Sequence, residues 1–164
     1  MSFGNTELRA LGYVMLAMLL GGIIGVEREL EDKPAGLRTH MLVAGASALL
    51  VMLGEIALQD FIASFGGTAV NTDPVRVLQA LVTGVAFLGA GTIIRHKAEP
   101  QIEGLTTASS LLFTAAVGAC VAFSYIVLAI GATVLVLITL RGLTIVERWL
   151  ENRRASEKNQ KRNS

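Results

Sequence analysis

Polar residues recur at helical spacing within two otherwise apolar stretches of the chain. The first stretch opens with Asp73 and Pro74, a pair typical of a helix start, because Asp caps the first turn and Pro fits into it. If these stretches span a membrane, their polar groups are costly there and mark candidate functional positions. Two such rows on neighbouring helices can line a hydrated path or hydrogen-bond to each other. The polar rows comprise Asp73, Arg76, Gln79 and Thr83 in the first stretch, and Thr106, Thr107, Ser110 and Thr114 in the second, which follows Glu103.

A purely structural interpretation of these rows stays open beside the functional one. Arg76 can pair with Asp73 three residues earlier, and hydroxyl groups can bond to carbonyls of their own helix. Gln79 has no such local explanation, which keeps the functional interpretation under consideration.

A charged segment follows the first apolar stretch. Its four acids, Glu27, Glu29, Glu31 and Asp32, are of the type that binds Mg²⁺ through carboxylate oxygens. The acids alternate with basic residues, and this balance favours a solvated loop over a dedicated cation site, so no metal site is assigned. His40 and His96 lie beside basic residues, which suits neither zinc binding nor a catalytic base. We expect both histidines at the membrane interface.

The chain shows no set of residues that would support enzymatic chemistry. We find no nucleophile with a base and an orienting group, and a single cysteine, Cys120, cannot supply a zinc site of the Cys type. We therefore expect a protein that is not an enzyme and uses no cofactor. The formal net charge of +1 gives no general attraction to nucleic acid, so no nucleic-acid partner is expected.

The composition points to a membrane protein of one domain. Of 164 residues, 52% are hydrophobic and only 16% are charged, whereas soluble domains carry about a quarter charged residues. So few charges cannot cover the surface of a soluble globule. The lipid bilayer is accordingly an expected partner, and the expected class is an all-α polytopic membrane protein.

The apolar runs predict five membrane spans. The uncharged stretch 104–140 is too long for one helix of about 20 residues, and a break near Cys120–Tyr125 would divide it in two. Two spans there put every basic loop and the basic tail on one side, as the positive-inside rule requires. The N-terminus then lies outside and the C-terminus in the cytoplasm. We expect spans near 8–26, 41–58, 75–94, 105–121 and 124–146 in a transmembrane domain 1–149, with a basic, disordered cytoplasmic tail at 150–164.

Small residues predict where the helices meet, because helices in lipid associate by close packing. The helix over 105–121 is rich in small and hydroxylated residues, so it should be central in the bundle, whereas 124–146 should face lipid. The expected packing residues are Ala17, Gly21 and Gly25 in the first span, and Gly84, Gly89 and Gly91 in the third.

A shift of 68 residues aligns the chain with itself. It matches Leu20-Gly21 with Leu88-Gly89, and Gly36–Thr39 with Gly104–Thr107. Under the expected topology this is a parallel repeat of helices one and two on helices three and four, related by an axis along the membrane normal.

The longest motifs resemble the MgtC/SapB family of bacterial membrane proteins. The run LLGGIIGVERELEDKPAGLRTHMLV at 19–43 resembles the first hairpin of that family, and two further matches follow at 73–93 and 104–108. Together they cover the first four spans in the family's order. The matching positions of the expected cytoplasmic loop motif are Glu27, Arg28, Glu29, Pro34, Gly36, Arg38, Thr39 and His40.

The resemblance implies a five-helix protein of the bacterial inner membrane, linked to magnesium limitation, acid stress and, in pathogens, survival inside host cells. It implies a regulatory or partner-binding protein, and the virulence branch is thought to act on the proton-translocating ATP synthase. Thr106 stands where that branch carries Asn, which places this chain nearer the SapB side, and residues 147–164 leave no room for the family's soluble C-terminal domain. The alternative is an ion or small-solute transporter or channel, linked to Mg²⁺ or H⁺ and working as an oligomer. A homodimer and a membrane-protein partner are expected.

Overall fold

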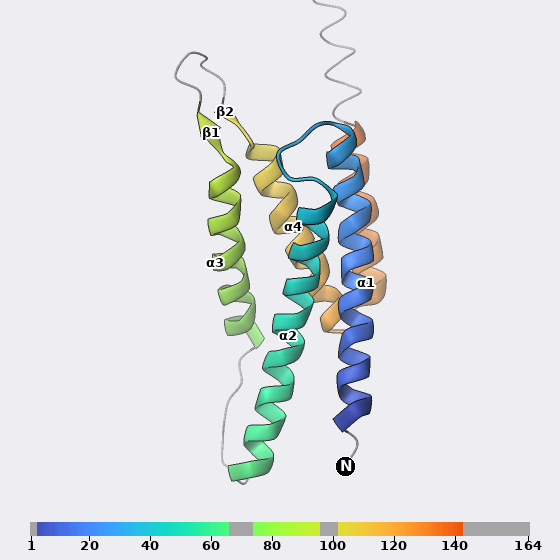
Figure 1. Cartoon of the computed structure of the whole chain (residues 1–164), viewed down its shortest axis with the longest axis vertical. Helices are drawn as coiled ribbons and strands as arrows, with labels where there is room; N and C mark the ends of the chain where they lie inside the picture. The colour runs from blue at the N-terminus through green and yellow to red at the C-terminus, as the bar shows by residue number, and fades with distance from the viewer. Residues whose placement is uncertain (1–2, 66–73, 96–101, 143–164) are drawn as a thin grey trace, which may run out of the picture.

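The computed structural model describes residues 3–65, 74–95 and 102–142, and within them the chain forms five helices (Figure 1). These are α1 (Phe3–Leu30), α2 (Leu37–Phe65), α3 (Pro74–Thr92), α4 (Leu105–Ala122) and the helix Ile126–Gly142. The first four are long and apolar enough to cross a membrane. The prediction of an all-helical, five-helix membrane protein is confirmed to this extent, whereas the basic tail lies outside the described residues.

The helices differ in length. At 1.5 Å per residue, α1 and α2 are each about 42 Å long, whereas α3 and α4 are about 28 Å, close to the thickness of the hydrocarbon core. The additional turns of α1 and α2 extend the bundle at the end where the chain begins (Figure 1). We call this the N-terminal end.

The opposite end carries a feature that the apolar pattern does not predict. Strands β1 (Ile94–Arg95) and β2 (Ile102–Glu103) pair antiparallel there, beside the turn between α1 and α2 (Figure 1). Gly104 joins β2 to α4 with φ of 90°, a conformation that favours glycine, and a Cβ at this position would overlap the Thr92 carbonyl. Glycine at this position lets the start of α4 pass close to Thr92, the last residue of α3. We call this the hairpin end.

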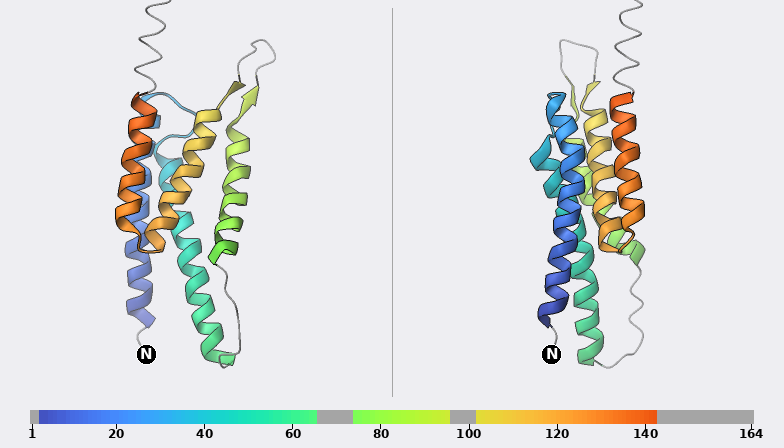
Figure 2. Two further views of the ribbon diagram at one scale, coloured as in Figure 1. Left: turned by 180° about the vertical axis from the view of Figure 1, so that it is seen from behind. Right: turned by 90° about the vertical axis from the view of Figure 1, so that its right-hand side faces the viewer.

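The long uncharged stretch forms two helices, as predicted. Ser124 adopts a positive φ of 63°, and the amide of Tyr125 donates to the Cys120 carbonyl over 2.8 Å, which closes a tight turn. The chain then reverses, and Ile126–Gly142 runs back toward the hairpin end (Figure 2).

The five helices share the buried core unequally. Helix α4 packs against α1, α2 and α3, and 56% of its spanning window is buried, against 17% for α3 (Figure 2). The prediction that α4 is central is confirmed. The core of the molecule thus lies among α1, α2 and α4, and α3 is attached mainly through α4.

Candidate functional site

Glycines on α1 allow its backbone to approach α2 closely. A Cβ at Gly21 would lie 2.6 Å from both the Ala44 Cβ and the His40 carbonyl oxygen, and one at Gly25 would lie 2.7 Å from the Leu37 Cα. Real side chains do not tolerate such distances, so these two positions require glycine if the contact is to be kept. Ala17, one turn before Gly21, is fully buried in the core. The predicted packing face of α1 therefore lies against α2.

Helix α4 meets α2 on its hydroxylated face. A Cβ at Gly118 would overlap the Ala44 carbonyl and lie 3.0 Å from the Ser47 Cβ. Thr107, Ser110 and Thr114 precede Gly118 at steps of three and four residues, so all four lie on the same face of α4. The side chains of Thr107, Ser110 and Thr114 are buried, which places these three members of the second polar row inside the bundle.

His40 lies where these contacts converge, and its side chain is fully buried in the bundle. Its Nδ1 is 2.9 Å from the Gly36 carbonyl, and its Nε2 is 3.1 Å from the Ser110 Oγ. The side chain is buried because Gly25 leaves room for it under α1, while Ser110 on α4 supplies a buried polar partner.

The hydrogens of this contact can be arranged in two ways. A carbonyl only accepts, so Nδ1 carries a proton and donates it to Gly36. A neutral ring then accepts at Nε2, and the Ser110 hydroxyl must donate to it. A protonated ring instead donates to Ser110, which leaves the hydroxyl free to donate to the Thr107 carbonyl 2.9 Å away. The site can therefore hold His40 in either protonation state with its ring nitrogens paired.

A buried ion pair lies on α1 close to this histidine. Arg28 donates to both carboxylate oxygens of Glu27, over 2.6 and 2.8 Å, and the two residues are only 2% and 4% exposed. Both charges are near enough to act on His40 electrostatically. We call Glu27, Arg28, His40, Thr107 and Ser110 the polar cluster.

The turn after the ion pair is organised by Glu29. Its carboxylate accepts from the Leu37 amide over 2.8 Å, which satisfies a free N–H at the start of α2. A Cβ at Gly36 would overlap this carboxylate, so a larger residue here would require the Glu29 side chain to move. Pro34, Arg38 and Thr39, the other members of the loop motif, are exposed.

The acids of this segment are not arranged around a cation. Within residues 3–65, 74–95 and 102–142, no three His, Cys, Asp or Glu side chains form a group that could hold a metal ion. Glu27 instead faces Arg28, and Glu29 faces a backbone amide.

The first polar row has different surroundings from the second. Arg76, Gln79 and Thr83 are exposed on α3, and the Thr83 hydroxyl donates to the Gln79 carbonyl over 2.8 Å. Asp73 lies outside the described residues. The structure therefore brings Ser110 to His40, buries Thr107 one turn earlier on α4, and leaves the α3 row on the surface; Thr106 is exposed as well.

The glycines of α3 are also divided. A Cβ at Gly89 would lie 3.3 Å from the Ala108 Cβ, which is a close contact with α4. At Gly84 and Gly91 it would meet no heavy atom within 4 Å. These two predicted packing residues therefore make no close helix contact within the described part of the chain.

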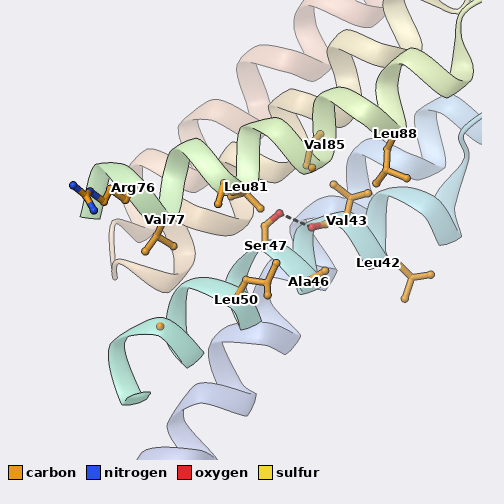
Figure 3. A pocket seen from close by; sticks show the side chains of 13 residues that line it. Leu42, Val43, Ala46, Ser47, Leu50, Arg76, Val77, Leu81, Val85 and Leu88 are labelled. Carbon is orange, nitrogen blue, oxygen red and sulfur yellow. Dashed lines mark hydrogen bonds between the residues drawn. The ribbon is translucent and has the colours of Figure 1, made fainter. Parts of the chain in front are cut away.

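An open groove separates α3 from α2 (Figure 3). It has a volume of about 710 Å³ and a wall that is almost wholly apolar, with Val43, Leu50, Leu81 and Val85 among the lining side chains. Ser47 lies in the wall, but its hydroxyl donates to the Val43 carbonyl of its own helix over 2.7 Å (Figure 3).

The sequence does not reveal that His40 and Ser110, 70 residues apart, share a hydrogen bond. The available signal is indirect: Gly21 and Gly25 mark one close contact, and the hydroxylated row of α4 marks another. Whether His40 and Ser110 meet depends on the rotation of α2 and α4 about their axes, which the sequence pattern does not fix.

Comparison with known proteins places this fold in a family. The MgtC family profile matches residues 14–149. The chain is 39% identical over 145 residues to protein SrpB of Synechococcus elongatus, a match covering 84% of this chain and 77% of that protein. It is 37% identical over 127 residues to the putative magnesium transporter YhiD of Escherichia coli, covering 77% of this chain and 57% of that protein.

A third relative is the protein MgtC of Salmonella typhimurium, 33% identical over 124 residues, where the match covers 76% of this chain and 48% of that protein. The chain spans less than two thirds of the length of YhiD, of MgtC and of a relative from Haemophilus influenzae. No solved structure matches this chain significantly.

Proposed function

The chain belongs to the MgtC family, and from that premise we propose that it is a regulatory or partner-binding membrane protein linked to magnesium limitation or acid stress. It acts by contact with another membrane protein and catalyses no reaction. Its place is the bacterial inner membrane, with the N-terminus outside, the hairpin end and the C-terminus at the cytoplasm, and the chain assembled as a homodimer.

One observation favours this proposal over a transport function: the two polar rows have separate surroundings. Thr107, Ser110 and Thr114 are buried against α2, whereas Arg76, Gln79 and Thr83 are exposed on α3. A carrier that used both rows would need them to face one shared path. Among the described residues, every buried side-chain nitrogen and oxygen atom already has a hydrogen-bond partner, as expected of a closed structural core.

A second candidate function is transport of Mg²⁺ or H⁺ by an oligomer. The name of YhiD, the Escherichia coli relative, favours it, as do the buried Glu27, Arg28 and His40, since ionisable groups at membrane depth often mark ion pathways. In this account the polar cluster would form one end of a path completed at a subunit interface.

The proposed parallel repeat is supported by equivalent contacts in the two helix pairs. The Gly21 position meets His40, and the Gly89 position, 68 residues later, meets Ala108, which is likewise 68 residues after His40. The His40 amide donates to the Gly36 carbonyl, just as the Ala108 amide donates to the Gly104 carbonyl. The pairs α1–α2 and α3–α4 would then be related in structure and differ in the loops that join their helices, and a partner protein would contact both pairs.

Flux measurements on the purified full chain in proteoliposomes distinguish the two candidates. We expect no Mg²⁺, H⁺ or small-anion flux above that of empty liposomes, together with a stable membrane partner that co-purifies from the native membrane. Reproducible flux that is lost in Gln79→Leu or Arg76→Ala, and kept in the exposed control Arg141→Gln, would establish transport instead.

A further inference from the structure

The groove between α2 and α3 is apolar along its length and has a single cation at one end. Arg76 lies at the end nearest the start of α3, and Leu42 and Leu88 lie at the other (Figure 3). The lining residues between them are aliphatic or small, apart from Ser47, whose hydroxyl is bonded to its own helix. An occupant that suits this surface has a long apolar part and one anionic end.

The length of the groove corresponds to one leaflet of a bilayer. Arg76 and Leu88 are twelve residues apart on α3, which is about 18 Å along a helix. Half of the hydrocarbon core is about 15 Å. Arg76 therefore lies at headgroup level when the apolar part of the groove lies among acyl chains, a position where its guanidinium can pair with a lipid phosphate.

Small residues hollow out the groove. Ala46 and Gly54 on α2 face Ala80 and Gly84 on α3, and a Cβ at Gly84 would meet no atom within 4 Å. The space at Gly84 is thus available to a ligand and is not used by a neighbouring helix of this chain. A volume of about 710 Å³ that opens sideways along the helices does not stay empty in a membrane.

We propose that the groove between α2 and α3 binds one acyl chain of an anionic phospholipid, with the lipid phosphate paired to the Arg76 guanidinium. The lipid comes from the leaflet at the N-terminal end of the bundle. It fills the space between two helices that otherwise touch little, and so it fixes the position of α3 relative to α2.

Native mass spectrometry of the detergent-solubilised full chain tests this site, with 1-palmitoyl-2-oleoyl phosphatidylglycerol as the anionic probe and the phosphatidylcholine of the same chains as the zwitterionic one. We expect the wild type to bind the anionic lipid about fivefold more tightly, and Arg76→Gln to remove that preference. The matched control is Arg141→Gln, an exposed arginine in the helix Ile126–Gly142, which should keep it.

A second pair of variants tests the apolar part. Gly84→Leu places a side chain inside the groove, and excluding two buried methylene groups should weaken binding of both lipids about tenfold. Gly91→Leu changes the same helix at an equally open position that does not line the groove, and should bind as the wild type does.

Several results would overturn the proposal. Equal affinity for the two lipids in the wild type would remove the role of Arg76, and unchanged binding by Gly84→Leu would place the acyl chain elsewhere. A lipid-free dimer that becomes monomeric on Gly84→Leu would show that a second copy occupies the groove. A co-purified transmembrane helix lost in the same variant would assign the groove to a partner protein.

Discussion

The two sides of α2 are built differently. On one side, Gly25 of α1 and Gly118 of α4 let helix backbones approach α2 closely, and His40 bonds to Ser110 inside that contact. On the other side, α3 stands off, and the glycine that faces α2, Gly84, meets nothing. Both sides contain small residues at helical spacing, so spacing alone does not distinguish a packed face from an open one.

This difference separates structural roles from contact roles. The packed side holds the buried charges and hydroxyls: Arg28 pairs with the adjacent Glu27, and His40 bonds to Ser110 of another helix. The open side presents Arg76, Gln79 and Thr83, together with an apolar groove. We therefore expect substitutions on the packed side to lower stability, and substitutions on the open side to change binding with little effect on folding.

The largest effect is expected from breaking the ion pair. Glu27→Leu leaves Arg28 buried without its partner and should lower the free energy of unfolding by about 4 kcal/mol, measured by denaturant titration in detergent. The double variant Glu27→Leu/Arg28→Leu should lose less of the free energy of unfolding than Glu27→Leu alone, because no buried charge remains unpaired. A double variant less stable than Glu27→Leu would contradict the account.

The close contact between α1 and α2 comes next. Gly25→Leu forces a side chain against the Leu37 backbone and the His40 Cβ, and should cost about 3 kcal/mol, seen as a lower melting temperature and lower expression. Gly84→Leu on the open side is the matched control and should change stability by less than about 1 kcal/mol. Equal losses in both variants would remove the distinction between the two sides.

The sequence predicts the number of helices but not the surroundings of every side chain. The apolar runs and the turn near Ser124 suffice for five helices, because hydropathy and helix breaking are local properties. The buried surroundings of His40 are not predicted because they depend on α4, which follows some 65 residues later in the chain. The same limit applies to Gly84 and Gly91, since a small residue signals that a helix can approach and not that one does.

The buried hydrogen bond between α2 and α4 gives a smaller effect. Ser110→Ala removes the partner of the His40 Nε2 and should cost about 1–2 kcal/mol in the same unfolding titration. Ser109→Ala is the matched control, because Ser109 is exposed and bonds only to the Leu105 carbonyl of its own helix. If both variants were equally stable, the interhelical bond would contribute nothing measurable.

The smallest effect is expected at the end of α3. Gly91→Ala introduces a Cβ into open space and improves helix propensity, so stability should stay the same or rise by up to about 1 kcal/mol. Thermal unfolding of the variant beside the wild type measures this. A clear loss of stability would contradict this expectation, because it would mean that Gly91 packs closely against another helix.

Cysteine labelling tests most directly the central claim that the two polar rows do not share a path. In a Cys120→Ala background, cysteines at positions 79 and 83 (Gln79→Cys, Thr83→Cys) and at positions 110 and 114 (Ser110→Cys, Thr114→Cys) are treated with N-ethylmaleimide in native membranes, with unfolded protein as the reference. The account predicts that positions 83, 110 and 114 are labelled at least about tenfold more slowly than in the unfolded protein, because position 83 faces acyl chains and positions 110 and 114 are buried in the bundle, so none of these thiols meets the water in which the reactive thiolate forms. Equal and rapid labelling at all four positions would show one hydrated path, and would contradict it.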